Sequence, residues 1–212
     1  MTSTKKLVPP RSPPRIRRTQ EERSATTRAL LLDATIDCLH QLGYAGTTTT
    51  EIADRAGVSR GAQLHHFPTK QELVGTAVSW VLDRRLDEFK RAWAELPKDT
   101  DRASAAIDLL WNATSGPAFY AWLELLVAAR TDPSLRKTIQ DISTRFSQGV
   151  IDAFHEVFPE SAGVRGLDMG PWFVLAILQG IALEKIVIDN DPRVPMGLAA
   201  LKGMVSRTLK PR

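Results

Sequence analysis

The 212-residue sequence predicts an all-α fold of about nine helices: an N-terminal three-helix unit with a helix-turn-helix, and a larger C-terminal helical unit. Three observations predict this fold. Apolar residues recur with a period of about 3.6 residues along most of the chain, as they do on amphipathic helices. N-cap residues, glycines and prolines divide the pattern into segments of helical length. No segment shows the strict apolar–polar alternation of a half-buried strand.

The chain begins with a basic, proline-rich stretch. Residues 1–19 hold six Lys/Arg and few large apolar side chains, so we predict a disordered basic arm. The pattern becomes helical at about residue 20, and we place one domain at 20–68 and a second at 69–212. The first helix runs from the start of this pattern to Gly43, because glycine readily adopts the left-handed conformation that ends a helix.

Two short helices follow in the first predicted domain. Thr48 and Glu51 have the S/T-x-x-E spacing of a capping box, which opens a helix directly after Thr48. Gly57 ends that helix within three turns. Ser59 is a favourable N-cap residue for the next helix, which we expect to reach about His66.

The second predicted domain begins with another capping box. Thr69 and Glu72 have the same spacing and open a long helix over Lys70–Leu96, which would measure about 40 Å. Short breaks at proline, glycine and Asp-Pro separate the helices that follow. Five further helices are predicted, at about 101–115, 117–130, 132–158, 169–189 and 195–209.

Composition and charge restrict the class of protein. The apolar share of 43% and charged share of 25% fit a globular chain with a buried core. Residues 1–70 hold eleven Lys/Arg and six Asp/Glu, which fits either a polyanionic partner or an ordinary solubilising surface. A single cysteine, Cys38, and no signal-peptide pattern indicate a reducing cytoplasm. The longest apolar run, Trp172–Leu183, is shorter than the about 20 residues that span a bilayer, so we expect no membrane partner.

The stretch Gly57–Gly61 reads G-x-S-x-G, a pattern that two unrelated classes of protein share. In a serine hydrolase it is the nucleophile elbow, between a strand and a helix of an α/β sheet. In a helix-turn-helix it is the turn and the start of the recognition helix, which enters the major groove of DNA. The residues before Ser59 are predicted to be helical and no sheet is predicted. We therefore favour the helix-turn-helix and expect a protein that is not an enzyme.

The run GYAGTTTTEIADRAGVSRGAQLHHFPTKQEL (Gly43–Leu73) resembles the DNA-binding signature of the tetracycline repressor (TetR) family. The motifs GY, TT, EIA, AGVS-[KR]-G and HHF-P-[ST]-K-x-x-L all stand at the family spacing, and the resemblance reaches back to about Thr19. The rest of the chain is similar to the family only in architecture, a variable helical domain for ligand binding and dimerisation. The family usually has an aromatic residue, often Tyr, where this chain has Leu64.

The recognition helix is expected to present its first residues to the major groove. Arg60 can pair with guanine or a phosphate, and Ala62 can contact a thymine methyl group. Gln63 either pairs with adenine or lies solvated at the surface. The resemblance implies that residues at helix starts clamp the DNA backbone, where N–H groups favour phosphate. The basic arm is either an inert tail or adds backbone or minor-groove contacts. The full predicted set is Thr47, Thr48, Ser59, Arg60, Gly61, Ala62, Gln63, His65, His66 and Lys70.

The C-terminal domain has two predicted features. Large aromatic residues and two acids in apolar stretches suggest a pocket for a small apolar or aromatic effector with one cationic or hydroxyl group; otherwise these aromatics are core and the acids surface. The predicted pocket residues are Trp111, Phe119, Trp122, Glu124, Phe146 and Trp172. The helix at 169–189 is apolar on more than one face, which fits a homodimer interface or central burial in a monomer. The predicted interface residues are Phe173, Ile177, Gly180, Ile181, Leu198, Leu201 and Val205.

Taken together, these features predict a cytoplasmic transcriptional repressor that an effector releases from a palindromic operator. The effector would act by selecting one orientation of the Lys70–Leu96 helix. The alternative is a DNA-binding regulator without a small-molecule ligand, either an activator or controlled by a protein partner; the remote alternative is a serine hydrolase. No cofactor is expected. No metal is expected either, because the adjacent His65 and His66 point about 100° apart on a helix, which is poor geometry for two ligands of one ion.

Overall fold

The computed structural model describes residues 19–161, 167–188 and 190–209. These residues form nine α-helices and two short 3-10 turns, and no strand occurs among them, so the predicted all-α fold is confirmed. Apart from Thr19, the predicted basic arm lies outside the described residues.

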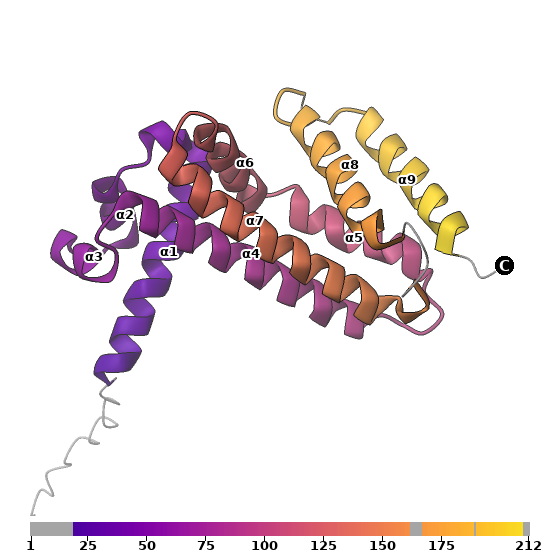
Figure 1. The fold of residues 1–212 in the computed structure, drawn as a ribbon, viewed down its shortest axis with the longest axis horizontal. Helices are drawn as coiled ribbons and strands as arrows, with labels where there is room; N and C mark the ends of the chain where they lie inside the picture. Colours follow the sequence, from indigo (N-terminus) through magenta and orange to yellow (C-terminus); the bar gives the residue numbers. More distant parts are fainter. Residues whose placement is uncertain (1–18, 162–166, 189, 210–212) are drawn as a thin grey trace, which may run out of the picture.

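Three helices gather at one end of the molecule (Figure 1). They are α1 (Gln20–Gly46), α2 (Thr49–Ala56) and α3 (Arg60–His66). Helix α1 is interrupted at Gly43, where φ is 67°, and continues for one short turn. The predicted helix stop at Gly43 is therefore a kink within α1.

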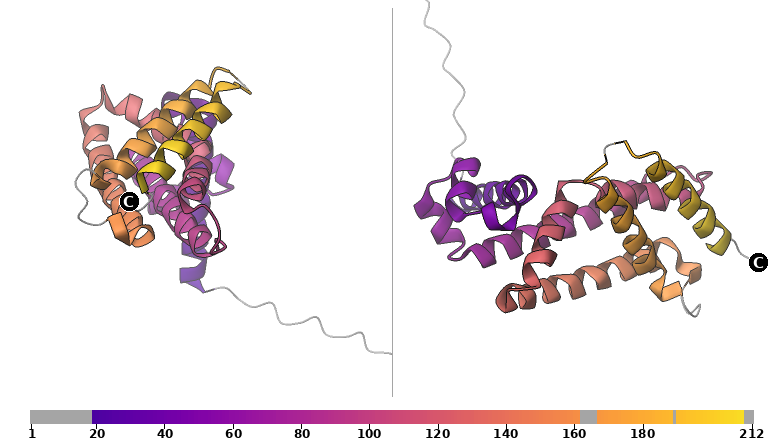
Figure 2. Two further views of the ribbon diagram at one scale, coloured as in Figure 1. Left: turned by 90° about the vertical axis from the view of Figure 1, so that its right-hand side faces the viewer. Right: turned by 90° about the horizontal axis from the view of Figure 1, so that it is seen from above.

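Six further α-helices follow in the described chain. Helices α4 and α7 run side by side through the middle, and α8 and α9 lie at the end opposite α3 (Figures 1 and 2). The bounds are α4 (Lys70–Ala94), α5 (Arg102–Thr114), α6 (Pro117–Ala129), α7 (Pro133–Val157), α8 (Gly170–Glu184) and α9 (Arg193–Leu209).

The predicted helix starts are confirmed, and local hydrogen bonds account for them. The side-chain oxygens of Thr48, Ser59 and Thr69 each accept a hydrogen bond from the backbone N–H three residues on. Asp132 caps α7 in the same manner, with Pro133 as the first helical residue. Each cap satisfies an N–H group that would otherwise lack a partner at the start of a helix.

Helix α8 is shorter than predicted. It ends at Glu184, and tight turn bonds follow, including Ile186 N–H to Leu183 O at 3.1 Å. The chain then reverses at Asn190, where φ is 58°. The apolar residues after α8 extended the apparent helical pattern to 189 although they lie in this exposed turn.

The largest core joins the two predicted domains. Its buried residues come from α1, α2, α4, α6 and α7, so the helix-turn-helix packs directly against the long helices. A separate cluster links α5, α8 and α9 through Ile107, Leu178 and Leu201. Leu201 is only 3% exposed, so its prediction as a dimer contact is wrong: this side chain packs within its own chain. Leu198 and Val205 lie partly buried against the same cluster.

Candidate nucleic-acid interface and cavity

The G-x-S-x-G stretch forms the corner between α2 and α3. Gly57 has φ 64° and ψ 30°, a left-handed conformation that glycine adopts without a Cβ penalty. Val58 N–H donates to Ala53 O at 2.9 Å, which closes the end of α2. Ser59 Oγ accepts from Ala62 N at 3.2 Å, so this hydroxyl caps α3. A nucleophile elbow would need a strand before the serine, and here helix α2 stands in that place.

Helix α3 presents a continuous exposed face. Arg60, Gly61, Leu64 and His65 are exposed, while Ala62 and His66 are half-buried. Leu64 is 48% exposed, an unusual position for a large apolar side chain in a helix of seven residues. This face is short and carries no acidic residue, which suits a helix that enters the major groove beside the phosphates.

Gln63 does not belong to this face. Its side chain is fully buried, and Nε2 donates to Phe67 O at 2.8 Å. The bond satisfies the carbonyl just past the end of α3, next to the buried Phe67 ring. Both predicted surroundings of Gln63, a base edge and solvent, are therefore wrong for the structure described here. Residues four apart lie on the same face of a helix, so Gln63 points inward with the buried Phe67.

Two of the predicted phosphate contacts are engaged within the chain. Thr47, predicted as a phosphate contact at a helix start, is fully buried: its Oγ1 donates to Gly43 O at 2.7 Å and its backbone N–H donates to the same oxygen at 3.1 Å. Lys70 Nζ donates to Tyr44 O at 2.6 Å and lies 4.0 Å from the centre of the Tyr44 ring. Burial lowers the pKa of Lys70. Thr48 remains exposed at the start of α2.

The two adjacent histidines do not form part of a metal centre in the described chain. The ring centres of His65 and His66 lie 5.5 Å apart at a steep angle. Within the described ranges, no group of three or more His, Cys, Asp or Glu side chains is placed to hold an ion.

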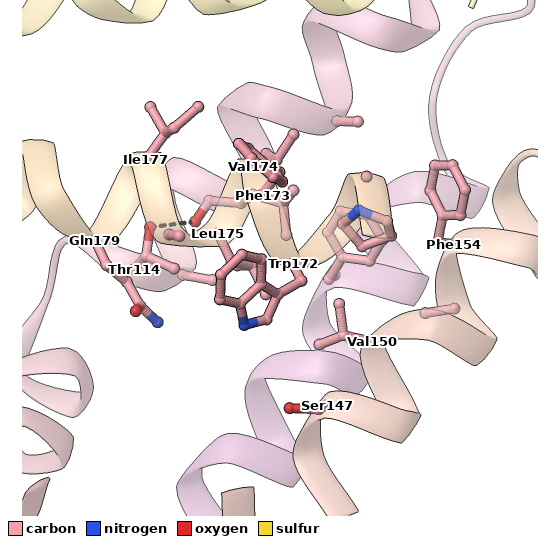
Figure 3. A pocket seen from close by; sticks show the side chains of 18 of the residues that line it. Thr114, Ser147, Val150, Phe154, Trp172, Phe173, Val174, Leu175, Ile177 and Gln179 are labelled. Carbon is pink, nitrogen blue, oxygen red and sulfur yellow. Dashed lines mark hydrogen bonds between the residues drawn. The ribbon is translucent and has the colours of Figure 1, made fainter. Parts of the chain in front are cut away.

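A cavity of about 540 Å³ lies between α4, α5, α6, α7 and α8, with α9 at its edge. Four of the predicted pocket residues line it: Phe119, Trp122, Phe146 and Trp172. In Figure 3, Trp172 projects from α8 toward Val150 and Ser147 of α7. This volume is within the range of small-molecule sites.

The other two predicted pocket residues lie elsewhere. Trp111 packs among α5, α8 and α9, with Lys185 Nζ 5.4 Å from its ring centre. Glu124 Oε2 accepts from the Tyr44 backbone N–H at 2.8 Å, which ties α6 to the kink of α1. Both predictions are wrong because neighbouring residues on one helix point to different sides.

Most residues of the cavity wall were not predicted from the sequence. Helix α7 contributes Ser143, Ser147, Val150 and Phe154, a stripe at helical spacing that a search for an i, i+3, i+4 pattern could have found. Helix α4 contributes Arg85 together with apolar neighbours. Nothing in the sequence distinguishes Arg85 from Arg84 and Arg91, the other arginines of α4.

Comparison with known proteins shows to which family a chain with this helix-turn-helix belongs. Residues 31–77 match the family described as "Bacterial regulatory proteins, tetR family". The HTH-type transcriptional regulator Rv2912c of Mycobacterium tuberculosis is 38% identical over 191 residues, which cover 87% of this chain and 97% of that protein. The chain belongs to the TetR family. The predicted resemblance is thereby confirmed, and the helix-turn-helix of a TetR-family chain is its DNA-binding element.

Two further proteins support the assignment. The HTH-type transcriptional regulator CymR of Pseudomonas putida is 33% identical over 175 residues, 80% of this chain and 84% of that protein. A crystal structure of a TetR-family transcriptional regulator from Rhodococcus sp. superposes with a TM-score of 0.70 at 19% identity, over 88% of this chain and all of that one. The chain is thus a TetR-family transcriptional regulator, and the Rhodococcus structure shows the fold alone.

Proposed function

We propose that this regulator is a repressor that binds a palindromic operator as a homodimer and leaves it when a small molecule fills the cavity. The observation that carries this proposal is the combination of an exposed recognition face on α3 with a cavity of about 540 Å³ in one continuous structure. In this proposal, residues 20–68 are the DNA-binding domain and 69–212 the effector and dimerisation domain. A cytoplasmic location accompanies this function.

Two helices connect the cavity to the DNA-binding end. Helix α4 begins at Lys70, which bonds to Tyr44 O, and its middle turns line the cavity through Leu82 and Leu86. Helix α6 lines the cavity with Trp122 and, two residues later, holds the kink of α1 through Glu124. An effector that binds one orientation of these helices better than the other shifts the spacing of the recognition helices in the dimer.

The proposed homodimer would cover an exposed apolar face on α8 and the turn after it. Phe173 is 61% exposed, and Ile177 and Gly180 are also exposed, as predicted for contacts with a partner. By length and apolar composition, Leu167–Glu184 could also cross a membrane. Burial against a second copy fits a TetR-family regulator better, because apolar patches of this kind mark protein interfaces. The exposed apolar residues of this region are Met169, Trp172, Phe173, Ile177, Leu183, Ile186, Val187, Ile188, Met196 and Met204.

Fluorescence anisotropy tests the proposal. A labelled duplex from the gene's own upstream region is titrated against a shuffled duplex over a salt series. We expect tight binding to the native duplex alone, with an affinity that falls steeply with salt. Arg60→Ala should weaken binding by about 1–3 kcal/mol. The exposed Arg207→Ala on α9 is the matched control and should leave affinity unchanged.

The outcomes separate the possible functions. Equal, weak binding to both duplexes by the unmodified protein would contradict the proposed operator specificity. Specific binding that no cavity ligand reverses would instead support a regulator controlled by a protein partner, or an activator.

A further inference from the structure

The side chains that line the cavity are mostly apolar, and one of them is charged. Among the described residues that line it, Arg85 is the only one with a charged side chain, and no Asp, Glu, Lys or His is included. The uncharged polar side chains are Thr114, Ser143, Ser147, Gln179 and Thr208. A charge beside apolar walls is poorly solvated, so it favours a ligand of opposite charge.

The guanidinium of Arg85 has N–H donors that make no hydrogen bond within the described chain. Its Nη1 donates to Glu88 Oε2 at 2.9 Å, but its Nε is buried and has no hydrogen-bond partner within the described chain. Glu88 Oε1 also lies 3.8 Å from Arg84 Nε. Arg84 is also paired with Asp33, whose Oδ1 lies 3.4 Å from Arg84 Nη1, so Glu88 chiefly neutralises Arg85. The N–H donors of Arg85 that Glu88 does not occupy remain at the α4 wall. An arginine with unused donors is suited to bind a carboxylate with two parallel hydrogen bonds.

Hydroxyl groups of α7 lie at about the same height along the cavity as Arg85 of α4. Leu86 contacts Gly149 where α4 meets α7, so Arg85 and Ser147 each lie within one helical turn of that contact. The Ser147 side chain lies on the cavity side of α7 (Figure 3). By contrast, the Thr114 hydroxyl donates to Leu110 O at 2.8 Å and is already engaged. The polar end of a ligand would therefore lie between α4 and α7.

We propose that the cavity binds a monoanionic amphiphile: a carboxylate with an alkyl or aromatic body. The carboxylate is bound by Arg85 and the α7 hydroxyls, and the body fills the space among Phe119, Trp122 and Trp172. This inference rests on the proposed function of the cavity as the effector site. A carboxylate replaces the cationic or hydroxyl group expected from the sequence, and a cation would be repelled by Arg85.

Direct binding measurements test the ligand class without DNA. The full-length protein is titrated at pH 7.5 with decanoate, decanamide and decylamine, and with 4-phenylbutyrate and its amide, all below their micellar concentrations. The signal is the tryptophan fluorescence of the protein, of whose five tryptophans Trp122 and Trp172 line the cavity. We expect at least one carboxylate to bind about tenfold or more tightly than its amide, as one charge-assisted hydrogen bond provides, and decylamine to bind most weakly.

Neighbouring arginines of α4 supply matched variants. Arg85→Gln should abolish the preference for the carboxylate over the amide while leaving the affinity for the amide nearly unchanged. Arg84→Gln removes the same charge from the adjacent residue, which lies 4.4 Å from the Trp80 ring centre and does not line the cavity. That variant should keep the preference. Glu88→Gln should strengthen carboxylate binding several-fold, because it removes a competing anion from Arg85.

Three results would overturn the proposal: no binding by any of the carboxylates, binding of an amide or of decylamine as tight as that of its carboxylate, or an unchanged preference in Arg85→Gln. Melting curves of the variants show whether each remains folded. Carboxylate binding without release of the operator duplex would contradict the proposed repressor mechanism and leave the assigned ligand class intact.

Discussion

Residues 63 and 64 of α3 are adjacent in sequence but differ completely in their surroundings. Gln63 is fully buried and bonded to Phe67 O, whereas Leu64 is 48% exposed beside Arg60 and His65 on the outer face. The Oε1 atom of Gln63 has no partner within the described chain. The polar residue therefore supports the fold, and the apolar residue lies on the face that we propose to contact DNA.

Exchanging these two side chains for alanine should separate stability from DNA binding. Gln63→Ala removes a buried hydrogen bond and leaves a cavity, so we expect a loss of about 1–3 kcal/mol in the free energy of unfolding, measured by urea titration. Its preference among operator base pairs should not change. Leu64→Ala should alter stability by less than about 0.5 kcal/mol and change operator affinity. A shifted base preference in Gln63→Ala at full stability would contradict the structural role.

His66 should make stability depend on pH. Burial is the main cause of the lowered pKa of His66, and His65 and Arg28 lower it further. The unfolded chain then binds a proton more readily than the folded one, so stability is lost as the pH falls through the unfolded pKa of about 6.5. We expect His66→Gln to lose less stability than the unmodified protein between pH 7.5 and 5.5 in urea titrations. Equal losses in both proteins would contradict this expectation.

At the scale of elements, two glycines test the helix-turn-helix corner. Gly57 has a positive φ and Gly61 lies within α3, and a Cβ at either position would meet no atom within 4 Å. Gly57→Ala should therefore destabilise by about 1–2 kcal/mol through backbone strain alone. Gly61→Ala should be neutral or stabilising by up to about 1 kcal/mol.

For DNA binding, we expect Gly61→Ala, the less destabilising of the two changes, to have the larger effect. The added methyl group at residue 61 lies on the exposed face of α3 and would hinder its close approach to the bases. We therefore expect Gly61→Ala to weaken operator binding in the anisotropy assay without loss of stability. A Gly57→Ala protein as stable as the unmodified one would be inconsistent with the left-handed turn.

The link between α6 and α1 depends on Glu124. Its carboxylate accepts the Tyr44 N–H, and a Cβ on Gly43 would come within 2.9 Å of Oε2. Glu124→Ala should cost about 1.5–3 kcal/mol, as for a hydrogen bond to a charged group, whereas Glu124→Gln keeps an acceptor oxygen and should cost less. Urea titration measures both. Equal stability of all three proteins would show that this contact does not hold the kink.

For the whole molecule, the proposed homodimer depends on the apolar face of α8. Phe173→Glu places a charge on this face, and we expect the dimer to dissociate at micromolar concentration, with loss of operator affinity. Val127→Glu is the matched control, because Val127 is 59% exposed on α6, away from this face. Sedimentation velocity measures the result. A Phe173→Glu protein of unchanged sedimentation coefficient would contradict the proposed interface.

The fold and the turn chemistry followed from local signals. Helix starts at Thr48, Ser59, Thr69 and Asp132 were predictable because each cap bonds to backbone only two or three residues away. The apolar stretch after Glu184 misled the prediction for α8, since an exposed apolar turn and a helix have the same composition. Composition alone does not specify where a chain reverses.

By itself, the sequence determined the all-α class, nearly every helix boundary and the TetR signature, because periodicity, caps and motif spacing are properties of short segments. The tertiary structure alone decided which face of each helix is covered. It buried Gln63, turned Glu124 toward α1 and brought Arg85 of α4 to the same cavity as Ser147 of α7. These placements depend on packing between helices that are far apart in the chain, and no local pattern encodes the angle at which two helices meet.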